Sequence, residues 1–469
     1  MEIISLSTSA RPKRKVLRLR LLKLLHIVLI TLPCAIAWRR AYVRLLPEQM
    51  QGAGLAAVLL VFLLLYVLFT RIYGAFLISQ SRISELVGSQ FLSALLTDGF
   101  CWLLIALLAQ RVPNVLPMLL ALTAQGLVAL LWTYWMHQWY FRTFPRAKSV
   151  LIYGDAALAE RMSSDPAMCK RYDLERELHV SECDDALRCL DGAEVVFLAG
   201  VEGHLRDEVL KYALAHDVPL YMIPRIGDII MSGAARIHMF HDPLLRVARY
   251  HPRPEYSLGK RLFDLMVSAV ALGVLSPILL ITALAVKLSD GGPVLYRQTR
   301  LTKDGKTFSL LKFRSMRVDA EADGVARLST GAQDSRVTAV GRVLRKYRID
   351  ELPQLLNILA GDLSIVGPRP ERPEIAAEYE QTLPEFRLRL QAKAGLTGYA
   401  QVYGKYNTDP YHKLQLDLMY IANPGFLEDL RICFATVKTL FMAESTEGVQ
   451  EGMTTAMETE ETVAASRRG

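Results

Sequence analysis

The sequence is poor in the residues that build disulfide frameworks, zinc sites and nucleophile–histidine pairs. Six cysteines are scattered along 469 residues, with no CxxC pair and no Cys/His group at zinc-ligand spacing. This scarcity argues against a disulfide framework and indicates that the soluble parts face a reducing compartment. After residue 259 the only histidine is His412 and the only cysteine is Cys433. We therefore expect chemistry in the C-terminal region to use carboxylates and cations.

A glycine-rich nucleotide loop is also missing. SVLIYGDAALAERM predicts a strand, a turn and a helix, but it carries only Gly154 where a dinucleotide-binding domain has GxGxxG. EVVFLAG and VPLYMIP predict two further buried strands with helices between them. We predict a Rossmann-like α/β domain over residues 146–250, of a degenerate nucleotide-binding type, with a parallel sheet used for packing or regulation.

Long apolar segments are abundant. Four occupy residues 21–38, 53–70, 91–110 and 114–135, and each is near the ~20 residues that a helix needs to cross a bilayer. All five tryptophans lie in the first third of the chain, as is typical of membrane interfaces. The leading segment RPKRKVLRLRLLK is strongly basic, which favours a cytoplasmic N-terminus. We predict a four-helix transmembrane bundle over residues 1–145.

A fifth apolar segment, residues 262–288, contains Ser276 followed by Pro277. Proline removes a helical N–H and kinks or breaks a helix. The segment is therefore either a kinked spanning helix or a re-entrant helix that enters and leaves by the same face. A spanning helix would put everything after it outside the cytoplasm, where nucleotide-activated substrates are scarce.

Cations are concentrated after this segment. Residues 294–349 hold thirteen Lys/Arg against five Asp/Glu, which fits either a basic surface at an anionic leaflet or a phosphate site. In KFRSM, Lys312 and Arg314 alternate with apolar residues and are predicted on one face of a strand. In GPRPE, Arg369 stands between two prolines that stiffen the backbone, which suits bidentate phosphate recognition. No nucleic-acid-binding module is present in the sequence.

Two adjacent carboxylates, Asp350 and Glu351, follow Arg348 and precede an apolar run in RIDELPQLLNIL. Because Pro353 is best tolerated in a first helical turn, we predict Asp350 at or near a helix N-cap and Glu351 just inside. Asp350 could simply cap the helix, at about 1 kcal/mol. A helix N-terminus also lowers a carboxylate's pKa, and the pair could hold Mg²⁺ or attack phosphorus. The residues alone leave cap and catalysis open.

IDELPQLLNILAGDLSIVGPRPE, with KFRSM before it and AGLTGYAQVYGK after it, resembles the bacterial polyprenyl-phosphate sugar-phosphate transferases. These are the large monotopic phosphoglycosyl transferases that initiate exopolysaccharide, capsule and O-antigen synthesis. The resemblance covers about residues 256–440. It implies an α/β catalytic domain over residues 256–445 that includes the re-entrant helix, broken at Ser276 and Pro277, and residues 446–469 are predicted to be a disordered tail.

The family's reaction moves a sugar-1-phosphate from a UDP-sugar to polyprenyl (undecaprenyl) phosphate and releases UMP. The resemblance implies that Asp350 is the nucleophile and forms a covalent phospho-sugar enzyme, with Glu351 binding metal or transferring a proton. It also implies Mg²⁺ held by Asp350 and Glu351, and phosphate contacts from the cations Arg369, Lys312, Arg314 and Arg348. The site is expected at the cytoplasmic face of the bacterial inner membrane, where the bilayer is itself a partner. A homo-oligomer and association with downstream glycosyltransferases stay open.

The sequence departs from the family pattern at Ala394, Tyr399 and Tyr403, and RQTRLTKDGK lacks a common glycine near Thr302. These departures leave the sugar unassigned. Two rival functions are a membrane-anchored nucleotide-sugar dehydratase or epimerase and a non-catalytic scaffold of a polysaccharide assembly complex. YSLGK, residues 256–260, has the Tyr-x-x-x-Lys spacing of the first rival, but no GxGxxG precedes it.

Overall fold

A computed structural model describes residues 13–46, 51–79, 81–183, 188–317, 336–404 and 409–439. The predicted tail at 446–469 lies outside these ranges. The chain divides into two compact units, Met1–Ile223 and Pro224–Gly469. This division falls earlier than the predicted end of the α/β domain at residue 250.

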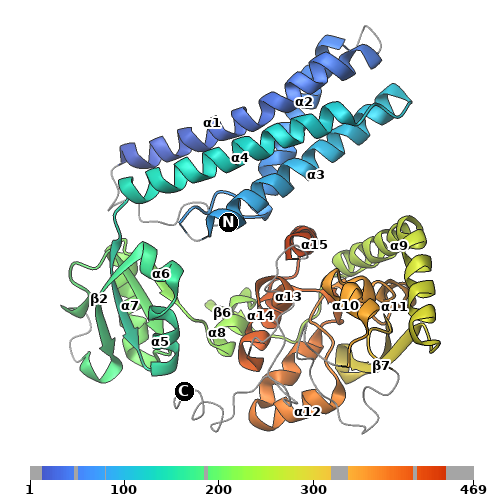
Figure 1. The fold of residues 1–469 in the computed structure, drawn as a ribbon. Coiled ribbons are helices and arrows are strands. Elements are labelled where there is room, and N and C mark those ends of the chain that lie inside the picture. Colours follow the sequence, from blue (N-terminus) through green and yellow to red (C-terminus); the bar gives the residue numbers. More distant parts are fainter. Residues whose placement is uncertain are drawn as a thin grey trace. The chain divides into compact units, whose positions relative to one another are not determined.

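Long helices form the first part of the N-terminal unit (Figure 1). They are α1 (Lys13–Ala37), α2 (Gln51–Ile72), α3 (Ile83–Ala109) and α4 (Leu116–Thr143), and α1 continues into a π-helical turn, Trp38–Tyr42, and a 3-10 turn, Val43–Leu45. Each predicted apolar segment is thus helical. Four helical stretches of the described chain are long and apolar enough to cross a membrane, Val16–Leu45, Ile83–Ala109, Leu116–Thr143 and Pro254–Ser289, while Ala56–Ile72 is a shorter apolar helix.

The helices of this bundle bury polar side chains and expose apolar ones. Asp98 on α3 and Gln125 on α4 are buried, and Gln125 Nε2 donates to the Ile30 carbonyl of α1 at 3.1 Å. Leu107 and Leu131 are 67% and 70% exposed. A few buried polar side chains within an otherwise apolar interior, together with an apolar exterior, are expected of helices surrounded by lipid.

A parallel sheet follows, with the strand order β2-β1-β3-β4. Its strands are β1 (Ala147–Tyr153), β2 (Tyr172–His179), β3 (Val195–Ala199) and β4 (Leu220–Met222), and its helices are α5 (Ala156–Ser163), α6 (Pro166–Arg171) and α7 (Gly203–Ala215). The three predicted strands are present. The sequence YDLERELH of β2 was not predicted as a strand, because its charged residues alternate with only half-buried positions at the sheet edge.

The C-terminal unit begins before the predicted catalytic domain. Helix α8 (Ile226–Ser232) packs on α14 (Pro410–Ala422), and Ile229 is buried in the core of this unit. An exposed hairpin follows, β5 (Ala235–Met239) and β6 (Asp242–Arg246). Residues 224–250 therefore belong to the C-terminal unit rather than to the unit of the parallel sheet.

The rest of this unit is mostly helical, with two small sheets. Strands β7 (Leu295–Leu301) and β8 (Thr307–Phe313) pair antiparallel, and β9 (Ser364–Val366) pairs parallel with β10 (Gly395–Thr397). The further helices are α9 (Pro254–Asp290), α10 (Ala339–Lys346), α11 (Gln354–Ala360), α12 (Pro373–Thr382), α13 (Tyr399–Tyr403) and α15 (Phe426–Thr439). One apolar core, which includes Ile358, Leu363 and Leu414, joins most of these elements, while α10 packs in a smaller cluster with Val286 and Phe313.

Helix α9 carries the predicted Ser276-Pro277 break. Figure 1 draws it as two arms that meet at a bend. Pro277 has no N–H for the carbonyl of Gly273 four residues earlier, and the Ser276 hydroxyl donates to that carbonyl at 2.7 Å. Both arms pack on the same unit: Phe263 lies against the core that contains Ile358, and Val286 lies in a cluster with residues of β8 and α10.

The first arm of α9 has one polar face and one apolar face. Its inward residues Tyr256, Lys260, Asp264 and Ser268 recur every four positions, so they share one side of the helix. Asp264 accepts hydrogen bonds from the Ser364 hydroxyl and the Ile365 N–H of β9. The opposite face exposes leucine, valine and methionine, and only 11% of the apolar span is buried. This exposed apolar surface is suited to contact with lipid.

Candidate active site around Asp350 and Glu351

The carboxylate pair lies in a 3-10 turn, Ile349–Glu351, between α10 and α11. Arg348 precedes the turn with φ of +53°, the left-handed region that arginine rarely adopts. Pro353, not Asp350, is the N-cap of α11, and it has no side-chain capping bond. The predicted N-cap position of Asp350 is therefore wrong: i→i+3 bonding continues through the turn, as from Leu352 N–H to the Ile349 carbonyl, so α11 starts later.

Three cations surround the Glu351 carboxylate. Arg369 Nη2 lies 3.0 Å and Lys312 Nζ 3.3 Å from Glu351 Oε1, and Arg348 Nη1 lies 3.8 Å from Oε2. Burial alone would raise the pKa of Glu351, but Arg369, Lys312 and Arg348 together hold it well below its usual range. Burial lowers the pKa of Lys312, and the Glu351 charge opposes that shift. Glu351 is thus ionised and gathers cations from β8, the 3-10 turn and the GPRPE loop.

Asp350 has a different environment. Its side chain is buried, at 8% exposure, and within the described ranges it forms no ion pair. Burial, with the Glu351 charge, raises the pKa of Asp350, while Lys312 and Arg345 act in the opposite direction. The prediction of a lowered pKa at a helix N-terminus is therefore not met, because burial and the adjacent carboxylate outweigh the cations.

Arg314 is the predicted cation that the structure does not bring to Glu351. Strand β8 ends at Phe313, so Arg314 no longer shares the strand face of Lys312. Its backbone N–H donates to the Val294 carbonyl, and its buried guanidinium packs against Gly292, where a Cβ would clash with it. Arg345, a cation of the segment that leads into the carboxylate pair, acts on Asp350 instead: its charge opposes the rise of the Asp350 pKa, and its Nε donates to the Ser315 hydroxyl at 2.9 Å.

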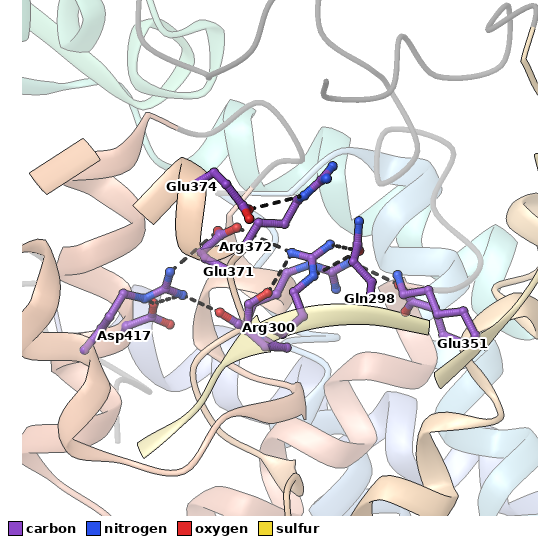
Figure 2. Close-up of polar contacts among 11 residues, drawn as sticks. Gln298, Arg300, Glu351, Glu371, Arg372, Glu374 and Asp417 are labelled. Carbon is purple, nitrogen blue, oxygen red and sulfur yellow. Dashed lines mark hydrogen bonds and ion pairs between the residues drawn. The ribbon is translucent and has the colours of Figure 1, made fainter. Parts of the chain in front are cut away.

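A second group of charges lies beside the GPRPE loop (Figure 2). Arg300 donates to Gln298 Oε1 and to the Pro370 carbonyl, and its Nη1 lies 3.8 Å from Glu371 Oε2. Burial lowers the pKa of Arg300 to about 10. Burial alone would raise the Glu371 pKa, but Lys413, Arg389 and Arg300 lower it below the usual value. No local sequence pattern marks this group, since its members come from β7, the loop and more distant helices.

The turn after β1 packs closely on the turn after β3. A Cβ on Gly154 would meet the Gly200 carbonyl at 2.6 Å, so the turns after β1 and β3 are in direct contact. The Gly154 N–H donates to the Ala199 carbonyl, and the Asp155 carboxylate accepts from the first amides of α5. Two amides at the start of α5, where pyrophosphate binds in a dinucleotide fold, thus already have a side-chain partner.

The Tyr-x-x-x-Lys spacing at Tyr256 and Lys260 also has a structural explanation. The Tyr256 hydroxyl lies 2.8 Å and Lys260 Nζ 2.9 Å from Asp429 Oδ2, which joins α9 to α15. Tyr399, which departs from the family pattern, also makes a structural contact: its hydroxyl donates to Glu428 Oε1 at 2.8 Å.

The model of a family described as "Bacterial sugar transferase" matches residues 255–443. A UDP-glucose:undecaprenyl-phosphate glucose-1-phosphate transferase of Caulobacter vibrioides is 41% identical over 41% of this chain and 74% of the relative. The chain belongs to the bacterial sugar transferase family. An Escherichia coli K12 protein with the same printed name is 38% identical over 54% of this chain and 53% of the relative.

Another relative of this sugar transferase is a UDP-N-acetylgalactosamine-undecaprenyl-phosphate N-acetylgalactosaminephosphotransferase of Aeromonas hydrophila. It is 37% identical over 49% of this chain and 54% of the relative. The match spans about half the length of the Aeromonas and E. coli relatives. The resemblance drawn from the Asp-Glu and GPRPE motifs is confirmed, as is membership of an enzyme family of the sugar-phosphate transferase type. The family match begins at residue 255, so it leaves out α8.

Proposed function

We propose that this sugar transferase moves a sugar-1-phosphate from a UDP-sugar to polyprenyl (undecaprenyl) phosphate and releases UMP, as the first membrane step of exopolysaccharide, capsule or O-antigen synthesis. The printed names of the relatives support this reaction class. The observation that carries the proposal is the contrast within the carboxylate pair. Glu351 is neutralised by cations, whereas the buried Asp350 carboxylate forms no ion pair among the described residues and is available to react.

In the proposed mechanism an Asp350 carboxylate oxygen attacks the phosphorus that bears the sugar. The bond from that phosphorus to the bridging oxygen breaks, and UMP leaves with the bonding electrons. An oxygen of polyprenyl phosphate then attacks the same phosphorus, which breaks the aspartyl bond and regenerates Asp350. Dividing the transfer into two displacements is the usual advantage of a covalent intermediate.

The cations around Glu351 supply the electrostatic part of the mechanism. Arg369 and Lys312 meet at one Glu351 oxygen, and both are multi-donor cations of the kind that binds phosphate oxygens. Glu351 thus orients the cations in advance, and preorganised charge is an effective source of transition-state stabilisation. We propose this role for Glu351 in place of metal ligand or proton carrier.

Asp350 also fits a role as a Mg²⁺ ligand. Mg²⁺ is usually held by one or two carboxylates together with substrate phosphates, and Asp350 has a carboxylate without a side-chain partner among the described residues. Glu351 fits this role poorly, since Arg369, Lys312 and Arg348 already neutralise it. Bound Mg²⁺ would offset negative charge on the pyrophosphate and on the departing UMP.

We further propose that α9 is re-entrant in the cytoplasmic membrane and seats the active site at the inner leaflet. A straight helix of 37 residues would be about 55 Å long and could not return to the unit that it left. Both arms of α9 instead pack on the C-terminal unit, and its outward face is apolar. A water-soluble UDP-sugar and a lipid phosphate can react together only at headgroup depth.

The proposal is tested with purified full-length protein in nanodiscs with polyprenyl phosphate, Mg²⁺ and one of four nucleotide sugars. These are UDP-glucose, UDP-galactose, UDP-N-acetylglucosamine and UDP-N-acetylgalactosamine. UMP release that EDTA abolishes and that Asp350→Asn lacks is the expected result. A change in nicotinamide absorbance during turnover would instead favour the dehydratase or epimerase function. No release with any donor would favour the scaffold.

A further inference from the structure

The GPRPE loop, Gly367–Glu371, carries Arg369 toward Glu351. Its two prolines, Pro368 and Pro370, have no N–H. The loop must therefore be held to the rest of the unit largely through its carbonyl groups. The direction of the Arg369 side chain depends on how the peptide planes on either side of it are fixed.

Four successive carbonyls of this loop each accept a hydrogen bond. Gly395 N–H donates to the Pro368 carbonyl and Leu301 N–H to the Glu371 carbonyl, both at 2.9 Å. The two central carbonyls are held by guanidinium groups instead. Arg389 Nη2 donates to the Arg369 carbonyl at 2.8 Å, and Arg300 Nη1 donates to the Pro370 carbonyl at 3.0 Å.

Arg389 is fixed by an acid that plays no part in the proposed chemistry. Its Nε and Nη2 lie 2.8 and 2.7 Å from Asp417 Oδ2, and its Nη1 lies 3.5 Å from Glu371 Oε1. The Arg389 and Asp417 side chains are only 3% and 1% exposed. A buried ion pair adds little net stability because both charges lose their hydration, but it can define one geometry. Asp417 is supplied by α14, 48 residues beyond Arg369 in the chain.

We propose that Arg389, oriented by Asp417, is a positioning residue that aims Arg369 at Glu351 and at the transferred phosphate. The pair itself stays behind the loop and does not touch substrate. This positioning role rests on the proposed sugar-phosphate transfer, because that proposal assigns Arg369 to the phosphate. Lysine at position 389 would keep the charge, but its single ammonium group cannot reproduce the planar fork that reaches both Asp417 and the Arg369 carbonyl.

A double-mutant cycle tests this role with the full-length protein. The variants are Arg389→Lys, Arg369→Ala and the combination, assayed for kcat and KM of UMP release with the donor that the wild type uses best. Arg369→Ala is expected to lower kcat/KM by about 100-fold, the cost of one transition-state donor. Arg389→Lys alone is expected to lower it by about 10-fold or more, since small misplacements are costly. In the Arg369→Ala background, Arg389→Lys should change it by less than about two-fold.

Arg261 provides the matched control. Its guanidinium also donates to backbone carbonyls, those of Ile358 and Leu359, but it holds the end of α11 rather than the loop. Arg261→Lys should have the same effect in both backgrounds. Asp417→Asn repeats the cycle without changing the size of the side chain, in case Arg389→Lys does not accumulate.

The outcomes separate the two proposals. The positioning role is supported if the loss of kcat/KM from a change at position 389 or 417 is not additive with that of Arg369→Ala. The loss from Arg261→Lys should then be additive with it. If the wild type is active but the losses at positions 389 and 417 are additive with that of Arg369→Ala, the positioning role is wrong and the proposed function stands. Additive losses indicate a general effect on folding, which does not depend on Arg369. If the wild type releases no UMP from any of the four donors, the proposed function fails and the positioning role fails with it.

Discussion

Arg369 Nη2 lies 3.0 Å from Glu351 Oε1, the same oxygen that Lys312 Nζ approaches to 3.3 Å. One partly buried carboxylate oxygen thus organises two cations from separate segments of the chain. The neighbouring Asp350 carboxylate is buried without such an ion pair among the described residues. This asymmetry divides the carboxylate pair into a nucleophile and a group that holds cations.

Glu351→Gln is expected to separate these two roles. The change leaves Lys312, Arg369 and Arg348 without their shared counter-charge, so kcat/KM should fall by about 100-fold. Asp350 is retained, so the variant should still form the covalent phospho-sugar enzyme slowly. Rapid-quench assays with UDP-sugar alone measure this first step. A Glu351→Gln variant that turns over normally would contradict the organising role of Glu351.

The raised pKa of Asp350 predicts the acid limb of the pH profile. The reactive form is the carboxylate, and burial with the Glu351 charge makes it take up a proton at higher pH than an ordinary Asp, whose pKa is about 3.9. kcat/KM should therefore fall as pH decreases through that raised pKa. Because Arg345 opposes the shift, Arg345→Met should move the limb to still higher pH.

Arg342 is the matched position for this pH experiment, since it lies on the same helix and is exposed. Arg342→Met should leave the acid limb unchanged. An equal shift in both variants would show that general surface charge, rather than the field at Asp350, controls the limb.

The re-entrant path of α9 is tested by the accessibility of its two ends. Ser257 and Ser289 are exposed near the start and end of the helix. In a cysteine-free background, Ser257→Cys and Ser289→Cys should both react with a membrane-impermeant maleimide in inside-out vesicles, and neither should react in intact spheroplasts. If α9 spans the membrane, Ser289→Cys would instead be labelled in intact spheroplasts and not in inside-out vesicles.

Helix α8 is predicted to be part of the transferase core although it precedes the family match. Ile229 is 3% exposed and packs in the same cluster as Leu414. Ile229→Ala should destabilise the unit by about 2–5 kcal/mol, seen as a lower temperature at which UMP release is lost on heating. Met231→Ala on the same helix, at an exposed position, should cost less than about 0.5 kcal/mol. Equal losses of thermal tolerance would argue against the core role.

The sequence predicted elements whose signals are local. Apolar runs located the four N-terminal helices, SVLIYGDAALAERM predicted the strand, turn and helix around Gly154, and Ser276 with Pro277 marked a position inside the bent helix α9. The polar face of that helix was missed because Tyr256, Lys260, Asp264 and Ser268 lie at or beside a strongly apolar run. Their four-residue spacing was a signal that could have revealed it.

Other features depend on tertiary contacts that no local pattern encodes. Asp350 was expected to be a helix cap with a lowered pKa, but a 3-10 turn delays α11 and burial raises the pKa. Arg389 and Asp417 are far from Arg369 in sequence, and only the fold brings them behind its loop. Arg314 was expected at the site because of its spacing from Lys312, yet the strand ends between them.

The most direct test of the proposed mechanism is the mass of the full-length protein after incubation with the preferred UDP-sugar and Mg²⁺ in the absence of polyprenyl phosphate. A nucleophilic Asp350 predicts close to one equivalent of UMP released per enzyme and a sugar-phosphate adduct on the peptide that contains Asp350. The adduct should disappear when polyprenyl phosphate is added and should be missing in Asp350→Asn. UMP release that begins only after polyprenyl phosphate is added, with no adduct at any time, would contradict the mechanism and indicate direct transfer between the two substrates.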